Sequence, residues 1–101
     1  MRMMLRVTVP TEEGNKAVKD GRMARFIEHS LSDLKPEAAY FTAESGRRTA
    51  YLFVEIKDSS DMPYIGERFF FAFNAAVDFI PVMNVDELRK GLPRAMAAMA
   101  G

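Results

Sequence analysis

Three charged side chains interrupt stretches that otherwise read as apolar strands, and they could hold a ligand or one another. These residues are Arg6, Glu55 and Asp78. An arginine between two carboxylates on a covered surface requires pairing, because an unpaired buried charge is costly. Two interpretations stay open: a polar network that sets the register of a dimer, or a ligand site in which Arg6 holds a carboxylate or enolate. In the second, Tyr40 or Tyr51 would donate a hydrogen bond to the ligand.

A run of aromatic residues, Phe69-Phe70-Phe71 followed by Phe73, is the second candidate for a site. Helical spacing assigns Phe69 and Phe73 to the core, which leaves Phe70 or Phe71 to reach the flank or a partner. Core packing is the favoured interpretation of this run. Small residues in the preceding helical segment would nonetheless leave space opposite the aromatic cluster for an apolar ligand.

Histidine and cysteine chemistry is almost absent. His29 is the only histidine and the chain has no cysteine, so disulfides, thiolate nucleophiles and sulfur-ligated zinc are excluded. His29 falls on the polar face of its predicted helix, as a solvated surface residue would. We therefore predict no metal and no cofactor, and no residue can be assigned a catalytic role.

The composition is that of one neutral globular domain. The chain has 101 residues, 49% of them hydrophobic and 28% charged, with 14 basic and 14 acidic side chains. Zero net charge gives no general attraction to nucleic acid or anionic lipid. No apolar run is long enough for a signal peptide or membrane span. We expect a soluble, cytoplasmic protein with neither a nucleic-acid nor a membrane partner.

RNA binding is a further possibility, because RNA-recognition modules share the βαββαβ order that this sequence predicts. Arg47, Ala50 and Tyr51 fall partly on the aromatic strand pattern of those modules. Arg48 stands where that pattern has glycine, and the remaining aromatic positions are not aromatic. The sequence therefore disfavours RNA binding.

The first third of the chain reads as a strand followed by one helix. Residues Met3 to Val9 alternate between apolar and mixed positions, a period of two that predicts a strand ended by Pro10. Thr11 is the expected helix N-cap, and Pro36 ends the helix. Its expected apolar stripe is Ala17, Gly21, Ala24, Ile27, Leu31 and Leu34.

The middle of the chain predicts a hairpin and a second helix. Strands at Ala38 to Glu44 and Thr49 to Lys57 flank a turn at Ser45 to Arg48, where Gly46 can adopt positive φ. The segment Asp58-Ser59-Ser60-Asp61 supplies capping residues, and Pro63 follows at a position that a first helical turn tolerates, so a helix is predicted to begin there. Its apolar stripe is Ile65, Phe69, Ala72 and Phe73.

The last third predicts an edge strand and a capped helix. Ala76 to Met83 contains Pro81, which lacks the N–H that a central strand needs. Asn84 and Glu87 match a capping box and begin a third helix near Val85. We divide the chain into a domain at residues 1–92 and a helical tail at residues 93–101, whose role stays open.

This βαββαβ order predicts a ferredoxin-like α+β fold with an extra C-terminal helix. Strands one and three would be central, strands two and four at the edges, and both helices on one face. The other face would carry Met4, Arg6, Thr8, Tyr51, Phe53 and Glu55. Strand four adds either Asp78, Ile80 and Val82 or Val77, Phe79 and Met83, and the sequence does not decide between them.

Two large aromatic side chains on that second face need a cover. Leaving Tyr51 and Phe53 in water would cost about 1.5–3 kcal/mol each. A second copy of the sheet, the C-terminal helix or a ligand would serve as the cover, and a homodimer is the favoured choice.

The order, the length, the closing segment Val77 to Met83 and the turn at Glu44 to Arg47 resemble the dimeric α/β-barrel superfamily. The likeness covers about residues 3–92 and is nearest to small uncharacterised bacterial proteins of that type. It implies two sheets paired face to face and, in the enzymes, small hydrophobic substrates between sheet and helices. Quinol-forming monooxygenases of the group carry a Trp and a downstream His, which this chain lacks, so that activity is not implied.

The sequence thus favours a small-molecule-binding or enzyme-like homodimer that takes a small apolar or carboxylate ligand. The alternative is a non-catalytic interaction or regulatory domain whose function is dimerisation. A polar-lined cavity reached by Arg6, Tyr40 or Tyr51 would favour the first, and Arg6 enclosed by carboxylates in a packed structure would favour the second.

Overall fold

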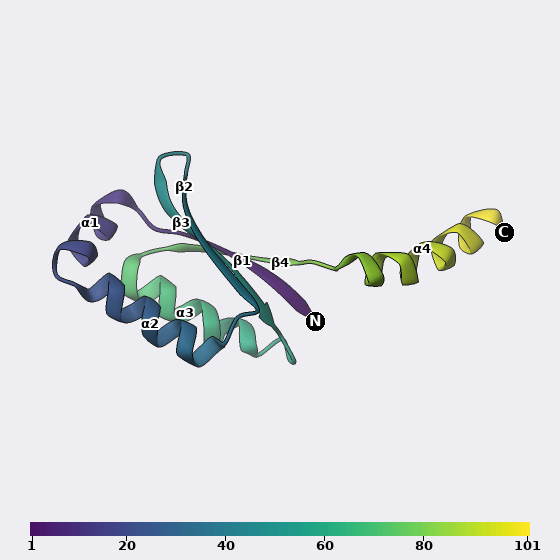
Figure 1. Cartoon of the computed structure of the whole chain (residues 1–101), viewed down its shortest axis with the longest axis horizontal. Helices are drawn as coiled ribbons and strands as arrows, with labels where there is room; N and C mark the ends of the chain where they lie inside the picture. The colour runs from purple at the N-terminus through teal and green to yellow at the C-terminus, as the bar shows by residue number, and fades with distance from the viewer.

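The computed structural model describes residues 1–101 as an α+β chain with one four-stranded antiparallel sheet and four helices (Figure 1). In chain order the elements are β1 (Arg2–Thr8), α1 (Thr11–Lys19), α2 (Arg22–Leu34), β2 (Ala38–Glu44), β3 (Arg47–Glu55), α3 (Asp61–Phe73), β4 (Ala76–Pro81) and α4 (Val85–Ala100). The strand order is β2-β3-β1-β4. The predicted central and edge positions are confirmed, and the edge position of β4 explains how the sheet accommodates Pro81.

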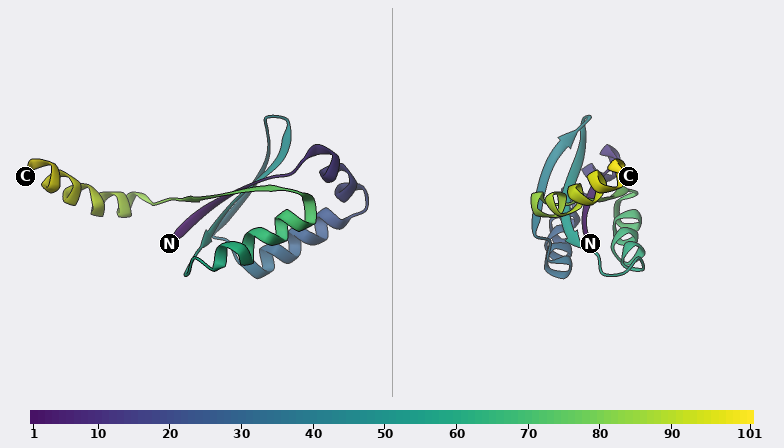
Figure 2. Two further views of the ribbon diagram at one scale, coloured as in Figure 1. Left: turned by 180° about the vertical axis from the view of Figure 1, so that it is seen from behind. Right: turned by 90° about the vertical axis from the view of Figure 1, so that its right-hand side faces the viewer.

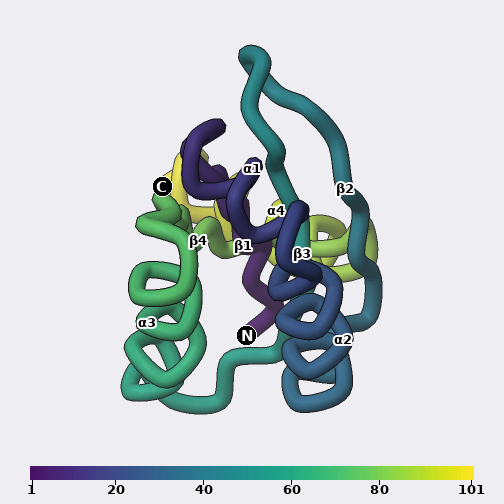
Figure 3. The backbone as a smooth tube through the Cα atoms, turned by 90° about the vertical axis from the view of Figure 1, so that its left-hand side faces the viewer, coloured from purple at the N-terminus to yellow at the C-terminus, as the bar shows by residue number.

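The alternation of β1 decides which face is the core. Met3, Leu5 and Val7 are buried on the helix side, whereas their neighbours are only half-buried on the other side. Leu5 is 0% exposed and lies opposite Leu52 of β3. The buried core joins residues of the two central strands, β1 and β3, to Ile65, Phe69 and Phe73 of α3. Helices α2 and α3 lie together on this side of the sheet (Figure 3).

The single helix predicted before Pro36 is wrong in two respects. It is two helices, α1 and α2, separated at Gly21, which has φ +79°. Glycine adopts this left-handed conformation without the penalty that a Cβ imposes, so the chain turns there. The N-cap of α1 is Pro10 rather than Thr11, which is already helical and makes no capping hydrogen bond.

The break at Gly21 also changes which residues of α2 face the sheet. Ala24 is exposed, although the continuous pattern placed it on the apolar stripe. The side chains that pack against the core from α2 are Met23, Phe26, Leu31 and Leu34. A new helix axis shifts the phase of the stripe, because a 3.6-residue period is defined only along one axis.

The β2–β3 turn is shorter than predicted. Ser45 and Gly46 both have positive φ, 53° and 77°, as the two central residues of a type I′ turn require. Both strands therefore reach the turn, and Glu44 pairs directly with Arg47. The outer part of the hairpin extends past the helices (Figure 1).

Strand β4 joins the sheet without a bulge, which settles its orientation. Asp78 lies opposite Arg6 and Ile80 lies opposite Met4. Asp78 and Ile80 therefore share the face that carries Arg6, while Val77 and Phe79 turn toward the helices and pack on the core.

Helix α4 projects from the body and covers nothing. It begins at the predicted capping box, in which Asn84 Oδ1 accepts from the Glu87 N–H at 2.8 Å and Glu87 Oε1 accepts from the Asn84 N–H at 3.0 Å. The helix continues through Pro93, and none of its residues is buried. It points away from the sheet, as the left view of Figure 2 shows, so it leaves the second sheet face uncovered. No helix of the chain has the length and apolar character needed to cross a membrane.

Candidate functional site

The uncovered side of the sheet, here called the open sheet face, carries a row of side chains that crosses all four strands. Tyr40 of β2 lies opposite Tyr51 of β3, which lies opposite Arg6 of β1, which lies opposite Asp78 of β4. Four of the six residues singled out in the sequence are thus brought into one line. The next row contains Phe53, Met4 and Ile80 and is apolar.

Arg6 is held by the carboxylate of Asp78. Its Nε and Nη2 atoms lie 3.2 and 3.1 Å from Asp78 Oδ2. This hydrogen bonding, together with the attraction between the charges, raises the pKa of the Arg6 guanidinium above its ordinary value. Arg6 is therefore already engaged within its own chain.

Glu44 completes this network, and the sequence reasoning overlooked it. Its Oε2 atom lies 4.0 Å from Arg6 Nη1, and its Oε1 accepts a hydrogen bond from the Tyr51 hydroxyl. The bond to Glu44 raises the pKa of the Tyr51 phenol, which keeps it protonated and donating. The signal was available, since Glu44 shares the strand parity of Tyr40.

Glu55 and Tyr40 do not join the network around Arg6. Glu55 lies at the far end of β3, opposite Arg2, and accepts from the amino group of Met1 at 2.5 Å. The side chain of Tyr40 is 65% exposed and makes no hydrogen bond. Arg6 therefore lies between Asp78 and Glu44, and Glu55 belongs to a separate ion pair at the chain's N-terminus.

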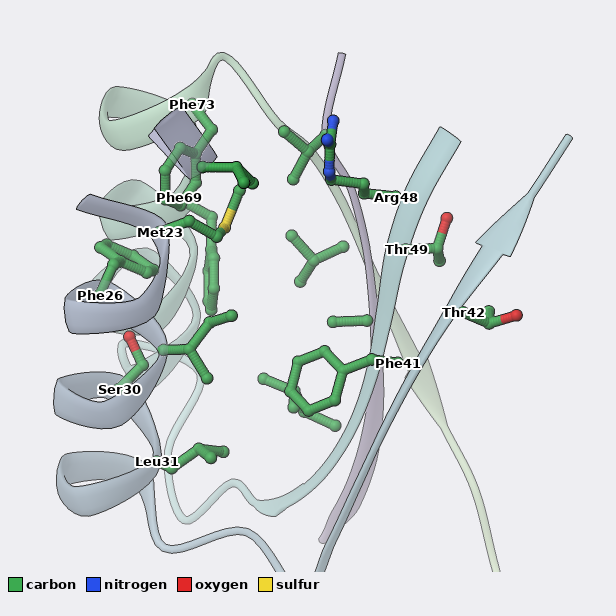
Figure 4. Close-up of a pocket in the computed structure, with 16 residues that line it drawn as sticks. Met23, Phe26, Ser30, Leu31, Phe41, Thr42, Arg48, Thr49, Phe69 and Phe73 are labelled. Atoms are coloured by element: carbon green, nitrogen blue, oxygen red, sulfur yellow. The ribbon is translucent and has the colours of Figure 1, made fainter. Parts of the chain in front are cut away.

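A cavity of about 320 Å³ lies on the opposite side of the sheet, between α2 and the β2–β3 edge (Figure 4). Twelve of its sixteen lining residues are hydrophobic. Phe69 and Phe73 line it, whereas Phe70 is 38% exposed and lies outside. This volume lies within the usual range of small-molecule sites, about 300–1,000 Å³.

The cavity exists because α2 is held by α3 more than by the sheet. Arg22 donates to the Ala72 carbonyl at 2.7 Å, and at the other end Asp33 accepts from Arg68 at 2.8 Å and from Tyr64 at 2.9 Å. These bonds to Asp33 lower the pKa of its carboxyl. Ring contacts of Phe26 with Phe69 and Phe73 add apolar attachment.

On the sheet side the space is bounded by a small residue and an exposed one. Ala50 of β3 faces the cavity and is too short to reach α2. Phe41 of β2 points toward α2 from the sheet edge (Figure 4), yet remains 54% exposed. The cavity therefore opens to solvent at the β2 edge.

Ser30 is the unusual residue of this cavity. It is 3% exposed, it is the one buried residue of α2, and its hydroxyl has no hydrogen-bond partner. A buried hydroxyl without a partner is destabilising, and most such groups in proteins are satisfied. The sequence reasoning did not single out Ser30, because one serine in an amphipathic pattern carries no signal before burial is known.

Arg48 is the one charged residue in the lining. Its guanidinium lies at the sheet side of the cavity (Figure 4), where Nη1 donates to Asn15 Oδ1 at 3.0 Å. It takes part in none of the ion pairs of the chain. Gly14 makes room for it, since a Cβ there would lie 2.8 Å from Arg48 Nη1.

The state of Ser30 predicts a stabilising substitution. Ser30→Ala should raise the free energy of unfolding by about 1 kcal/mol, because it removes an unpaired buried hydroxyl and improves helix propensity. Ser32→Ala is the matched control, since Ser32 is exposed in the same helix and changes propensity alone. Urea unfolding measures both. A lower free energy of unfolding for Ser30→Ala than for Ser32→Ala would mean that the Ser30 hydroxyl has a hydrogen-bond partner.

No group of three or more His, Cys, Asp or Glu side chains is placed to hold a metal ion. Fold and geometry define an α+β protein with a four-stranded antiparallel sheet, an apolar cavity on one face and an ion-pair network on the other. No protein family, curated protein or solved structure was found to match this chain.

Proposed function

We propose that this chain binds a small apolar ligand in the cavity between α2 and the sheet, and that it does so as a homodimer. The observation that carries the proposal is the cavity itself, which is apolar, of ligand size and open at one sheet edge. Its lining holds no histidine and no carboxylate, so the proposal is one of binding and assigns no reaction.

The proposal includes a fold class. The strand order β2-β3-β1-β4, with helices between β1 and β2 and between β3 and β4, supports a ferredoxin-like classification. The split of the first helical segment and the projecting α4 are additions to that plan. A dimeric α/β barrel would then form where two open sheet faces meet.

A neutral fluorescent probe tests ligand binding directly. N-phenyl-1-naphthylamine should become brighter on entering the cavity, and Ala50→Phe should reduce its affinity at least about tenfold by filling the space. Ala97→Phe adds the same ring at an exposed position of α4 and should leave the affinity unchanged. Equal affinity in both variants would reject the cavity as the binding site.

A second candidate function, dimerisation without a ligand, is favoured by the surface that the chain exposes. Its accessible area is 6966 Å², whereas a compact monomer of this mass would expose about 5,800 Å². Its radius of gyration is 16.8 Å, against about 13 Å for a compact chain of this length. The excess of about 1,200 Å² is larger than the roughly 800 Å² that each partner buries in a stable complex.

A second copy of this chain is the occupant that fits the open sheet face. The face offers an apolar row with Phe53, Met4 and Ile80 beside a polar row in which Arg6 is already paired. A partner must match both rows, and a two-fold axis presents the same two rows in return. In this second candidate the Arg6 network sets the register of the two sheets.

Helix α4 adds to the surface that a second copy would cover. Its exposed apolar residues recur at three- and four-residue spacing, and they are Val85, Leu88, Leu92, Met96 and Met99. Isolated helices shorter than about 12–15 residues are marginal in water, and this helix of sixteen residues is only slightly longer and carries Pro93 in its interior. Its own chain contacts this helix through the ion pair of Arg2 with Glu87 but buries none of the stripe, so the stripe fits the same dimer.

A further inference from the structure

The polar groups of the cavity indicate what kind of ligand it takes. Four lining residues are polar: Ser30, Thr42, Arg48 and Thr49. Thr42 and Thr49 point away from the cavity (Figure 4), and the Thr49 hydroxyl donates to the Arg47 carbonyl at 3.0 Å. Ser30 and Arg48 are therefore the two polar contacts that a bound molecule would meet.

Arg48 determines the charge of the ligand. It is the only ionised group in the lining, and no carboxylate of the chain neutralises it. Its remaining N–H groups can bind a carboxylate in the paired geometry that guanidinium favours. A molecule with an acidic end is attracted here, and one with a cationic end is repelled.

Ser30 determines a second feature. Its hydroxyl lies on the helix side of the cavity, at a different level from Arg48 (Figure 4). It is buried and unpartnered, which a structure tolerates at a place where a ligand atom supplies the missing bond. Everything between the two groups is apolar.

We propose that the ligand is an elongated apolar acid, whose carboxylate binds Arg48 and whose chain carries a further polar atom that hydrogen-bonds to Ser30. This proposal rests on the proposed ligand-binding function. At about 30 Å³ for each non-hydrogen atom, the share of a water molecule in the liquid, the cavity holds roughly ten such atoms. Decanoate and N-phenyl-1-naphthylamine have more non-hydrogen atoms than this, and the opening at the β2 edge lets either molecule extend beyond the cavity.

Three decyl compounds that differ only in their head group test the acidic end. Decanoate, decan-1-ol and decyltrimethylammonium are titrated at neutral pH and compete with N-phenyl-1-naphthylamine. We expect decanoate to bind about tenfold more tightly than decanol, because a charge-assisted bond to a half-exposed arginine is modest in water. Decyltrimethylammonium should bind most weakly, and added salt should reduce the preference.

Variants of two neighbouring arginines assign the preference to Arg48. Arg48→Gln should remove the advantage of decanoate over decanol, and Arg48→Lys should restore part of it. Arg47→Gln is the control, since this substitution removes the same charge from an exposed residue that does not line the cavity. Circular dichroism and urea unfolding confirm that each variant is folded.

A series of monohydroxydecanoates tests Ser30. One positional isomer should bind about fivefold more tightly than decanoate to the native chain, the value of one hydrogen bond. Ser30→Ala should abolish that gain, whereas Ser32→Ala, at an exposed position of the same helix, should retain it.

The outcomes separate the two proposals. If none of the three decyl compounds displaces the probe, the cavity does not bind apolar ligands and the proposed function fails. If decanol binds as tightly as decanoate, or Arg48→Gln leaves their ratio unchanged, the acidic end is wrong while ligand binding stands. If no hydroxydecanoate gains affinity through Ser30, the second polar contact is wrong.

Discussion

Replacing Phe53 by glutamate should convert a dimer of this chain into a monomer. Phe53 lies in the apolar row of the open sheet face, beside Met4. A carboxylate there would be buried without a partner when two sheets meet, which weakens association by at least about a hundredfold. Sedimentation equilibrium should give twice 11.4 kDa for the native chain and 11.4 kDa for the variant.

The same substitution at Phe71 provides the control. Phe71 is 86% exposed on α3, which packs on the other side of the sheet, so Phe71→Glu should leave the dimer intact. A native chain that sediments at 11.4 kDa at high micromolar concentration would reject the dimer. Loss of the dimer in both variants would indicate that the interface includes the helical side of the sheet.

Replacing Leu5 by alanine should lower the free energy of unfolding by about 3 kcal/mol. Leu5 is fully buried between Leu52 and Phe79 on the neighbouring strands, and its removal leaves a void that the sheet cannot close. Such a loss is a large fraction of the roughly 5–15 kcal/mol by which domains are stable. Urea unfolding at fixed chain concentration measures it.

Met4→Ala is the informative companion, because Met4 is the next residue on the same strand and faces the opposite side. The free energy of unfolding lost in Met4→Ala should depend on chain concentration, since the side chain contributes to folding of the dimer. The free energy lost in Leu5→Ala should not depend on chain concentration. If Leu5→Ala costs less than about 1 kcal/mol, the assigned faces of β1 are wrong.

Local patterns predicted much of the fold, because their causes are local. Steric preferences place a positive-φ pair at the β2–β3 turn with Gly46, and the missing N–H of Pro81 restricts its strand to an edge. The capping box of Asn84 and Glu87 formed as predicted. Alternation in β1 identified the core face, because a strand has a period of two whatever it packs against.

Other features depend on contacts between distant segments, and these were missed. A glycine at position 21 is compatible both with one continuous amphipathic helix and with two helices separated there. The packing of α2 against α3 favours two separate helices. The phase of β4 follows from its pairing with β1, which brings Asp78 rather than Glu55 to Arg6. Glu44 joins them from another strand.

The amino-acid sequence by itself determined the order and sheet positions of the four strands, the face of the sheet that forms the core and the exposed position of His29. The tertiary structure alone decided that Arg6 is held by Asp78 and that Ser30 is buried without a hydrogen-bond partner. It also placed Arg48 at an apolar cavity with no carboxylate partner. The physical reason is one of range. Backbone preferences and periodicity act over a few residues, whereas a cavity and an ion pair exist only once segments dozens of residues apart have packed.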